Sequence, residues 1–344
     1  MYNLMGRFCN ATKIQKRFGR YELITIFIML DIIHMTDKIE HLQGLIAAPF
    51  TPMHKDGTLN LSLIPVYYEF LKGNGISGAF ITGSTGEGVS LKTSEKMAVA
   101  EAWADCTSHD ADFKVMPLLG GTSVADCIDL ALHARAIGLY AISVTAPFYF
   151  KPAGIEALAE VCVAIAARVP DMPFYYYHIP ALTGVDLPMF DLLKALDERL
   201  PNLAGIKYTH EDFMDYLSCL RFKEGKYDML WGRDENMLSA LVLGAKGAVG
   251  STFNYAAPLY HRLIDAFKRN DLDEARALQQ DSIDMIRLLG KYGGIATGKA
   301  YMRLVGLDCG AFRLPVKNMD DRQFEAFRKD VLDIGFSSYM SLGV

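Results

Sequence analysis

The chain has few of the features that mark a disulfide-rich, metal-binding or serine-hydrolase protein. Its six cysteines are scattered over 344 residues, and no C-x-x-C pair occurs. We therefore interpret them as reduced thiols of a cytoplasmic protein. No two histidines have metal-ligand spacing, so we expect no metal and interpret His178 and His210 as hydrogen-bonding residues at strand ends. A G-x-S-x-G motif is also missing, which argues against a nucleophile elbow.

The chain also has no large excess of acidic or basic residues. The formal net charge is −5, and no run of lysine or arginine occurs in the main body of the chain. This argues against nucleic acid or an anionic membrane surface as a partner. With 51% hydrophobic residues the chain can bury a large core, and we expect its partner to be a small molecule.

The N-terminal segment imitates a secretory signal. A basic stretch at 13–20 precedes an apolar run at 23–30, but Glu22 and Asp31 flank that run and no small-residue cleavage site follows. The run is also far below the ~20 residues that span a bilayer. We expect residues 1–34 to be an extension outside the fold, with translation starting at Met35. A genuine export signal is the alternative.

Short apolar runs alternate with amphipathic stretches from residue 44 onward, which is typical of repeated parallel βα units. Eight strands are predicted, at 45–50, 79–82, 115–119, 141–145, 174–178, 204–208, 229–231 and 248–251. Helices are predicted between them at 94–106, 124–137, 155–167, 188–200 and 235–243. Eight such units predict an α/β fold, a (β/α)8 TIM barrel over residues 35–255.

The remaining residues, 256–344, are too many for one closing helix. Helical periodicity at 258–268, 272–289 and 322–332 predicts a C-terminal helical segment packed on the barrel. Residues 293–299 have the G-x-x-x-x-G-K spacing of a phosphate loop, but Ala300 replaces the required Ser or Thr. A doubly wound open sheet is disfavoured because the first strand ends in Pro49-Phe50-Thr51-Pro52 rather than in a glycine loop.

Lys207 is unusual among these strands because it ends an apolar run, Leu203 to Ile206, among uncharged neighbours. Burial lowers the pKa of an amine and leaves a nucleophile that condenses with a carbonyl. Schiff-base chemistry is therefore the first hypothesis, and a strand end that has reached solvent is the alternative.

Tyr177 is predicted to lie beside Lys207. Each residue is near the carboxyl end of its strand, and the two predicted strands are neighbours about 4.8 Å apart. A phenol beside an amine can move the protons that imine formation requires. Aromatic runs in strands are also common core residues, so this pairing is a hypothesis until the geometry is known.

Other polar groups fall at the same predicted barrel mouth. Ser84 and Thr85 lie in a glycine-rich loop whose hydroxyl and N–H groups can hold a carboxylate, although a simple turn with a cap is the plainer interpretation. Asp234 and Glu235 open a predicted helix as a cap and a first-turn acid, and they can also accept hydrogen bonds from a polyhydroxylated substrate. Ser251 ends the eighth strand.

Three motifs give the chain a family resemblance. Between residues 44 and 335 it resembles the N-acetylneuraminate lyase and dihydrodipicolinate synthase family of Schiff-base pyruvate aldolases. The motifs that carry the resemblance are Gly83-Ser84-Thr85-Gly86-Glu87, Tyr177-His178-Ile179-Pro180 and Gly205-Ile206-Lys207.

The resemblance implies roles for these residues. Lys207 would form the imine with the keto carbon of pyruvate or sialic acid, Tyr177 would carry protons, and Ser84 and Thr85 would hold the pyruvyl carboxylate. Tyr149 matches a family tyrosine near a subunit interface and the site. No metal or organic cofactor is implied, and the family commonly forms homotetramers. The residues matching the sugar-binding end are Thr209, Gly232, Asp234, Glu235 and Ser251.

Leu182 helps to choose among family substrates. The synthase branch typically has an arginine two residues after the motif proline, where it binds a substrate carboxylate, and leucine cannot do this. The surrounding string, from Tyr176 to Gly184, looks like the sialic acid lyases. Reversible cleavage of N-acetylneuraminate to N-acetylmannosamine and pyruvate is therefore expected. The alternatives are an aldolase for another keto-deoxy sugar acid, a dihydrodipicolinate synthase, or a non-catalytic sugar-acid sensor.

Overall fold

The computed structural model of the chain describes residues 39–343. The predicted 1–34 extension and the expected start at Met35 lie outside these residues. From His41 onward the chain forms one compact unit. None of the helices in the described part is long and apolar enough to cross a membrane.

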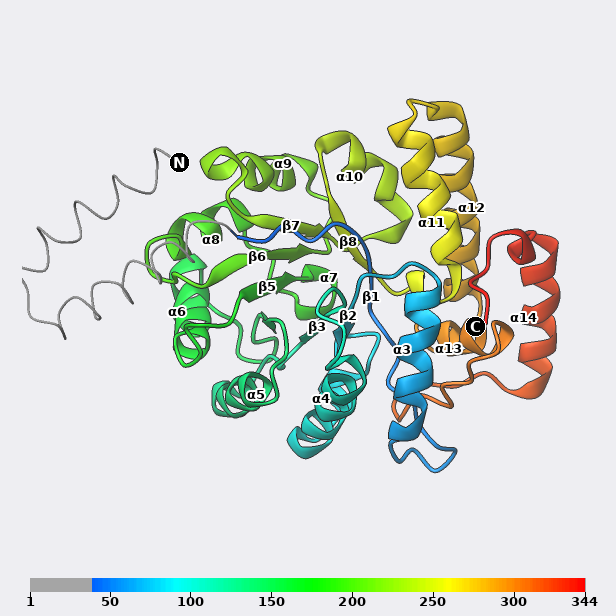
Figure 1. Cartoon of the computed structure of the whole chain (residues 1–344), viewed down its shortest axis with the longest axis horizontal. Helices are drawn as coiled ribbons and strands as arrows, with labels where there is room; N and C mark the ends of the chain where they lie inside the picture. The colour runs from blue at the N-terminus through cyan, green and yellow to red at the C-terminus, as the bar shows by residue number, and fades with distance from the viewer. Residues whose placement is uncertain (1–38, 344) are drawn as a thin grey trace, which may run out of the picture. The chain divides into compact units, whose positions relative to one another are not determined.

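Eight parallel strands form the centre of this unit, in the order β3-β2-β1-β8-β7-β6-β5-β4 (Figure 1). The two ends of the sheet, β3 and β4, meet through a parallel bridge between Leu118 and Ser143, so the sheet closes on itself. The predicted TIM barrel is confirmed. The strands are β1 (Gly44–Ala47), β2 (Gly78–Ile81), β3 (Lys114–Pro117), β4 (Ile142–Thr145), β5 (Phe174–His178), β6 (Leu203–Tyr208), β7 (Asp228–Trp231) and β8 (Gly247–Gly250).

Helices surround the strands because each βα unit must return the chain to the same end of the barrel. All five helices predicted here are present, although α8 ends at Leu196 instead of 200, and three further helices, α3, α7 and α9, were not predicted. The helices are α3 (Ile64–Gly73), α4 (Thr93–Thr107), α5 (Val124–Ala136), α6 (Ile155–Ala166), the short α7 (Pro180–Thr183), α8 (Met189–Leu196), α9 (Phe213–Arg221) and α10 (Met237–Leu243).

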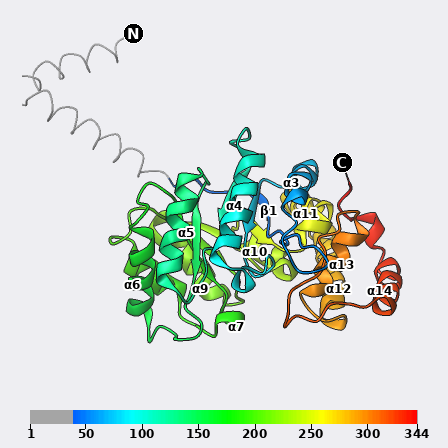
Figure 2. The same cartoon turned by 90° about the horizontal axis from the view of Figure 1, so that it is seen from below.

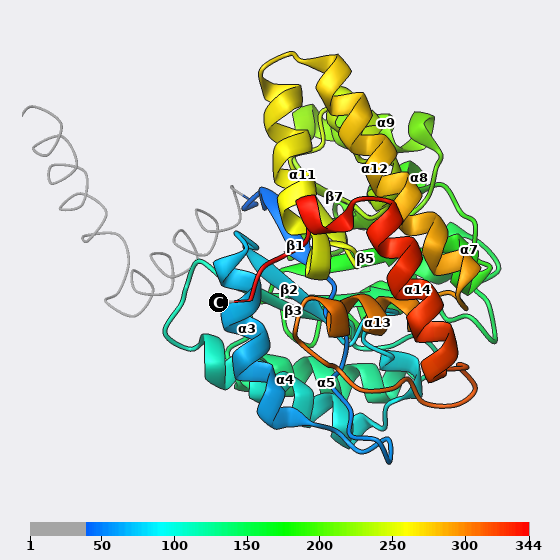
Figure 3. The ribbon, with the colours of Figure 1, turned by 90° about the vertical axis from the view of Figure 1, so that its right-hand side faces the viewer.

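Four helices follow the last strand, and they lie together in Figure 3. Figure 2 shows α12, α13 and α14 at the end of the unit away from α5 and α6. Helix α11 contacts β1 and β8, and α12 packs along α11. These helices are α11 (Phe253–Lys268), α12 (Leu272–Lys291), α13 (Ala296–Leu304) and α14 (Asp321–Asp333).

Two of these helices depart from the sequence prediction. Helix α11 begins at Phe253 instead of 258, and a non-helical residue, Ala256, kinks it two positions before Pro258. The kink removes the clash that a proline causes inside a regular helix. Helix α13 was not predicted, and it contains Gly298 and Lys299 of the rejected phosphate-loop motif. That motif is therefore helical instead of a loop following a strand.

Candidate active site

Lys207 is buried at the carboxyl end of β6, with only 3% of its surface exposed. Its Nζ lies 3.8 Å from the ring centroid of Phe80 and 4.1 Å from that of Tyr177. The strand end has therefore not reached solvent, and the alternative interpretation of this lysine is wrong. Phe80 was not singled out from the sequence, because nothing in β2 alone indicates that its ring covers a lysine on β6.

Burial in this aromatic surrounding lowers the pKa of Lys207 from 10.5 to about 7, and the nearby Asp234 carboxylate opposes this shift. Removing water from an ammonium group favours its neutral form. At neutral pH about half of the amines are then uncharged, against roughly one in 3000 for an ordinary lysine. An uncharged amine is the form that adds to a carbonyl carbon.

Tyr177 lies directly beside Lys207 in the sheet, as its Cα partner on β5. The amine faces the tyrosine ring and forms no hydrogen bond with the phenol in the described structure. Burial raises the pKa of Tyr177 to about 12, and polar contacts with Ser84 and Thr209 lower it in part. Thr209 Oγ1 still falls short of hydrogen-bond geometry. The phenol keeps its proton at neutral pH, so it can donate one.

The loop after β2 carries Ser84 and Thr85 in a strained backbone. Thr82 and Glu87, which flank them, have positive φ angles of 51° and 58°. Such angles are uncommon for residues other than glycine, most of all for the β-branched Thr82, and are held only where the surroundings enforce them. Here Thr82 Oγ1 donates to the carbonyl oxygen of Leu118 at 2.9 Å. The loop therefore presents Ser84, half-buried, and Thr85, buried, in a fixed conformation.

A buried ion pair anchors this loop to the C-terminal helices. Lys299 Nζ on α13 lies 2.9 Å from Glu87 Oε1, and both side chains are almost fully buried. The same ammonium donates to the carbonyl oxygen of Ala311 at 2.9 Å, and Glu87 Oε2 accepts from the Arg313 N–H at 2.8 Å. Lys299 was considered from the sequence only as a phosphate-loop lysine. Its true partner lies more than two hundred residues earlier, which no local pattern reveals.

Asp234 is buried and does not cap a helix. Its Oδ2 accepts hydrogen bonds from the backbone N–H and the hydroxyl of Thr252, at 2.9 and 2.6 Å. A Cβ at Gly250 would lie 2.3 Å from Asp234 Oδ1, so glycine is required for this approach. Burial raises the pKa of Asp234 to about 7, the Thr252 hydrogen bonds lower it, and the Lys207 charge lowers it further.

The other predicted sugar-end residues follow β6, β7 and β8. A Cβ at Gly232 would lie 1.9 Å from Thr209 Oγ1, so these two residues are adjacent. Glu235 is half-buried and pairs with Arg233 at 2.9 Å. Ser251 directly follows β8. The barrel thus gathers these groups at the same strand ends as Lys207 and Tyr177.

Tyr149 is placed differently. It is 78% exposed and packs edge-on against Phe150, which is 85% exposed, with ring centroids 5.1 Å apart. Among the described residues, no contact joins Tyr149 to Lys207 or Tyr177. Within one copy of the chain, Tyr149 is a surface residue.

Comparison with known proteins places this barrel in a family. The model of the dihydrodipicolinate synthetase family matches residues 41–333. The chain belongs to the dihydrodipicolinate synthetase family. One relative in it is the N-acetylneuraminate lyase of Rattus norvegicus, 40% identical over 280 residues, which are 80% of this chain and 87% of the relative. That of Pongo abelii is 38% identical over 305 residues, 88% of this chain and 95% of the relative.

Solved structures show the same family fold. The Proteus mirabilis N-acetylneuraminate lyase superposes with a TM-score of 0.83 at 38% identity, covering 86% of this chain and all of the lyase (100%). The lyase from Aliivibrio salmonicida also gives 0.83, at 36% identity, covering 86% of this chain and 98% of its own. A dihydrodipicolinate synthase gives 0.77 at 23% identity, which bears on the fold alone.

Proposed function

We propose that the chain is a Schiff-base aldolase that reversibly cleaves N-acetylneuraminate into N-acetylmannosamine and pyruvate. The observation that carries this proposal is the buried amine of Lys207, with a pKa lowered to about 7, at the mouth of a barrel of this family. The relatives named N-acetylneuraminate lyase, at 36–40% identity, support the choice of substrate. The reaction needs no metal or organic cofactor, because the imine itself accepts the electrons.

In this mechanism the neutral amine of Lys207 adds to C2 of the open-chain substrate, and loss of water gives a protonated imine. Removal of the proton from the C4 hydroxyl forms the aldehyde of N-acetylmannosamine, while the C3–C4 electron pair moves to the imine and leaves an enamine. Protonation of the enamine at C3 and hydrolysis release pyruvate and the amine. We assign these proton transfers to Tyr177, whose ring contacts Lys207 Nζ. The phenol donates its proton as water leaves, and the resulting phenolate accepts the C4 hydroxyl proton and passes it to C3 of the enamine. Hydrolysis of the remaining imine returns a proton to the phenolate.

We assign the substrate carboxylate to Ser84 and Thr85, on the loop that Glu87 and Lys299 anchor. The polyhydroxylated part of the sugar would then lie along the ends of β6, β7 and β8. Thr209 Oγ1, buried and without a hydrogen-bond partner, is suited to bind a substrate hydroxyl. The remaining groups assigned to this end are Gly232, Asp234, Glu235 and Ser251.

Other family substrates are less well supported. Leu182 lies on α7 with 65% of its surface exposed, and it offers no cation for the second carboxylate of a dihydrodipicolinate synthase reaction. A keto-deoxy sugar acid without the N-acetyl group fits the same chemistry at Lys207 and is the alternative substrate. A sensor without catalysis would have no use for an amine whose pKa is lowered toward neutrality.

Borohydride trapping tests the proposal directly. Reduction in the presence of pyruvate should leave a stable adduct on the peptide that contains Lys207, and Lys207→Met should abolish it. Lys96 is the internal control, because burial lowers its pKa too while its amine donates to the carbonyl oxygen of Leu119. A label on Lys96, or none at all, would contradict the assignment. Pyruvate release should then be measured from N-acetylneuraminate, N-glycolylneuraminate and keto-deoxy sugar acids. No release from either sialic acid would exclude the proposed substrate.

We also propose that the enzyme acts in the cytoplasm as a homotetramer. Five cysteines in the described part of the chain, Cys106, Cys127, Cys162, Cys219 and Cys309, are free, which fits a reducing compartment. The exposed pair Tyr149 and Phe150 supports association, because large aromatic side chains are enriched at protein interfaces.

A further inference from the structure

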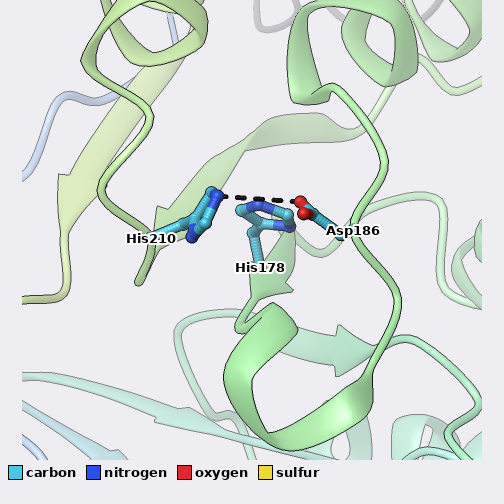
Figure 4. Close-up of side chains that lie close together, drawn as sticks. All are labelled: His178, Asp186 and His210. Atoms are coloured by element: carbon cyan, nitrogen blue, oxygen red, sulfur yellow. Dashed lines mark ion pairs between the residues drawn. The ribbon is translucent and has the colours of Figure 1, made fainter.

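Three side chains outside the proposed catalytic site gather at the ends of β5 and β6. His178 is the last residue of β5, His210 follows β6, and Asp186 lies in the loop between α7 and α8. One nitrogen of each imidazole and one carboxylate oxygen lie within 4.8 Å of one another. Figure 4 shows the imidazole of His178 projecting toward the ion pair between His210 and Asp186.

The cluster lies on the outer side of the barrel. Side chains alternate along a strand, so His178 points away from the face that Tyr177 shares with Lys207. The ring of His178 packs against Tyr208 and His210, with centroids 5.0 and 5.5 Å apart. The cluster is therefore separate from the amine and the phenol of the proposed reaction.

The donor set has the chemistry of a transition-metal site. Two imidazoles and one carboxylate bind zinc and its neighbours in the first transition row, with a further position left for water. His210 Nε2 lies 3.6 Å from Asp186 Oδ1, and tetrahedral zinc ligands lie about 3.3 Å apart. Separations of up to 4.8 Å require rotation of the more exposed side chains. Asp186, 73% exposed, and His210, 33% exposed, have room to rotate.

His178 supplies a second, independent observation. It is 1% exposed, and its Nδ1 is buried without a hydrogen-bond partner. Leaving such an atom unsatisfied costs about 1–3 kcal/mol, so most buried polar atoms in proteins have a partner.

The sequence analysis found no metal-ligand spacing and expected both histidines to form hydrogen bonds at strand ends. His178 Nδ1 lacks such a bond. The two histidines are close only because β5 and β6 are parallel neighbours in the barrel, so sequence spacing cannot reveal them.

We propose that His178, His210 and Asp186 bind one divalent transition-metal ion, with Zn²⁺ as the representative of its class. The ion would join the ends of β5 and β6 to the loop between α7 and α8. Its site does not depend on the proposed aldolase activity, and metal binding is measured separately from turnover.

The test uses the full chain without a histidine tag, treated with a chelator and then desalted. Equilibrium dialysis against Zn²⁺ should show one equivalent bound, and Co²⁺ should give the visible absorption of a bound ion. His210→Ala and Asp186→Asn remove exposed ligands, and each should weaken Zn²⁺ binding by about tenfold or more. The matched control is His133→Ala, which removes a half-buried histidine that pairs with Glu101 at 2.8 Å, and its affinity should equal that of the wild type.

Two results would overturn the proposal. One is wild-type protein that retains no Zn²⁺ at micromolar concentrations of the ion. The other is binding of equal affinity in the wild type, His210→Ala and Asp186→Asn, which would place the ion elsewhere. Near-ultraviolet circular dichroism of each variant checks that the barrel is intact. Pyruvate trapping on Lys207 in the same samples keeps the metal result separate from the catalytic one.

Discussion

The rings of Phe80 and Tyr177 help to exclude water from the amine of Lys207, and this burial underlies the reactivity that we propose for it. The resulting pKa of about 7 makes the reaction sensitive to pH near neutrality. Only the neutral amine adds to a carbonyl, and protonation removes it as pH falls. We therefore expect the rate of pyruvate trapping to drop about tenfold per pH unit below about pH 7 and to level off above it. Borohydride trapping that is stopped after a fixed time, at a series of pH values, measures this profile.

Asp234→Asn provides a sharper form of this pH experiment. The Asp234 carboxylate raises the pKa of Lys207, so its neutralisation should move the acid limb of the trapping profile to lower pH. Asparagine keeps an oxygen for the Thr252 hydrogen bonds. Asp281→Asn is the control, since burial raises the pKa of that carboxyl too, and it should leave the limb in place. An acid limb that stays fixed, or moves upward, in Asp234→Asn would show that this electrostatic argument is wrong.

Sequence reasoning placed some site residues well and missed others for a physical reason. The pairing of Tyr177 with Lys207 could be predicted, because each residue lies near the carboxyl end of its strand and the two strands are consecutive in the chain. The ring of Phe80 and the Thr252 contact of Asp234 could not. Both depend on which side chains meet across the barrel, and strand periodicity does not contain that information.

At the scale of elements, α13 acts as an anchor for the loop after β2. Its Lys299 is buried with Glu87, which belongs to the loop that carries Ser84 and Thr85. Removing one partner of a buried ion pair leaves an uncompensated charge and costs about 3–5 kcal/mol. We expect Lys299→Met to lower the free energy of unfolding by about this amount and to raise the KM for substrate, since the loop would lose its fixed conformation. Urea denaturation and steady-state kinetics measure the two effects.

Lys291→Met is the matched control for this ion pair. Its partner, Asp330, lies 2.5 Å away, but the two side chains are 59% and 26% exposed. A pair at the surface contributes about 0–1 kcal/mol, so this variant should be close to the wild type. Equal losses in Lys299→Met and Lys291→Met would contradict the anchoring role. The double variant Lys299→Met with Glu87→Gln should recover part of the stability, because no buried charge is left unpaired.

The elements themselves were predicted unevenly. All eight strands were predicted, because strands that are covered on both faces appear in the sequence as short apolar runs between turn residues. Helix α13 was missed because it is short and carries Gly298 and a buried charge, Lys299, where an amphipathic helix would show apolar residues. Gly298 is needed because a Cβ there would lie 2.3 Å from the ring of Phe50. This contact joins α13 to the segment after β1, which is far away in the sequence.

At the scale of the whole molecule, Tyr149 and Phe150 form an exposed aromatic pair after β4. Removing such rings from water contributes about 25 cal/mol per Å² of apolar surface, which favours association through this region. We expect the double variant Tyr149→Ser, Phe150→Ser to convert a tetramer into smaller species, measured by sedimentation velocity at several protein concentrations. The control is Val89→Ser with Val242→Ser, which removes two other exposed apolar side chains, 65% and 64% exposed, and should leave the assembly unchanged.

A further variant, Tyr149→Phe, distinguishes two roles of the exposed tyrosine. If Tyr149 also reaches the barrel mouth of a neighbouring copy, Tyr149→Phe should keep the tetramer and lower kcat, because the phenol is lost while the apolar contact remains. If Tyr149 serves the interface alone, Tyr149→Phe should resemble the wild type in both assembly and turnover. Wild-type protein that sediments as a monomer at every concentration would exclude both roles of Tyr149. The site would then have to work with the groups of one chain, of which Tyr177 already contacts the amine.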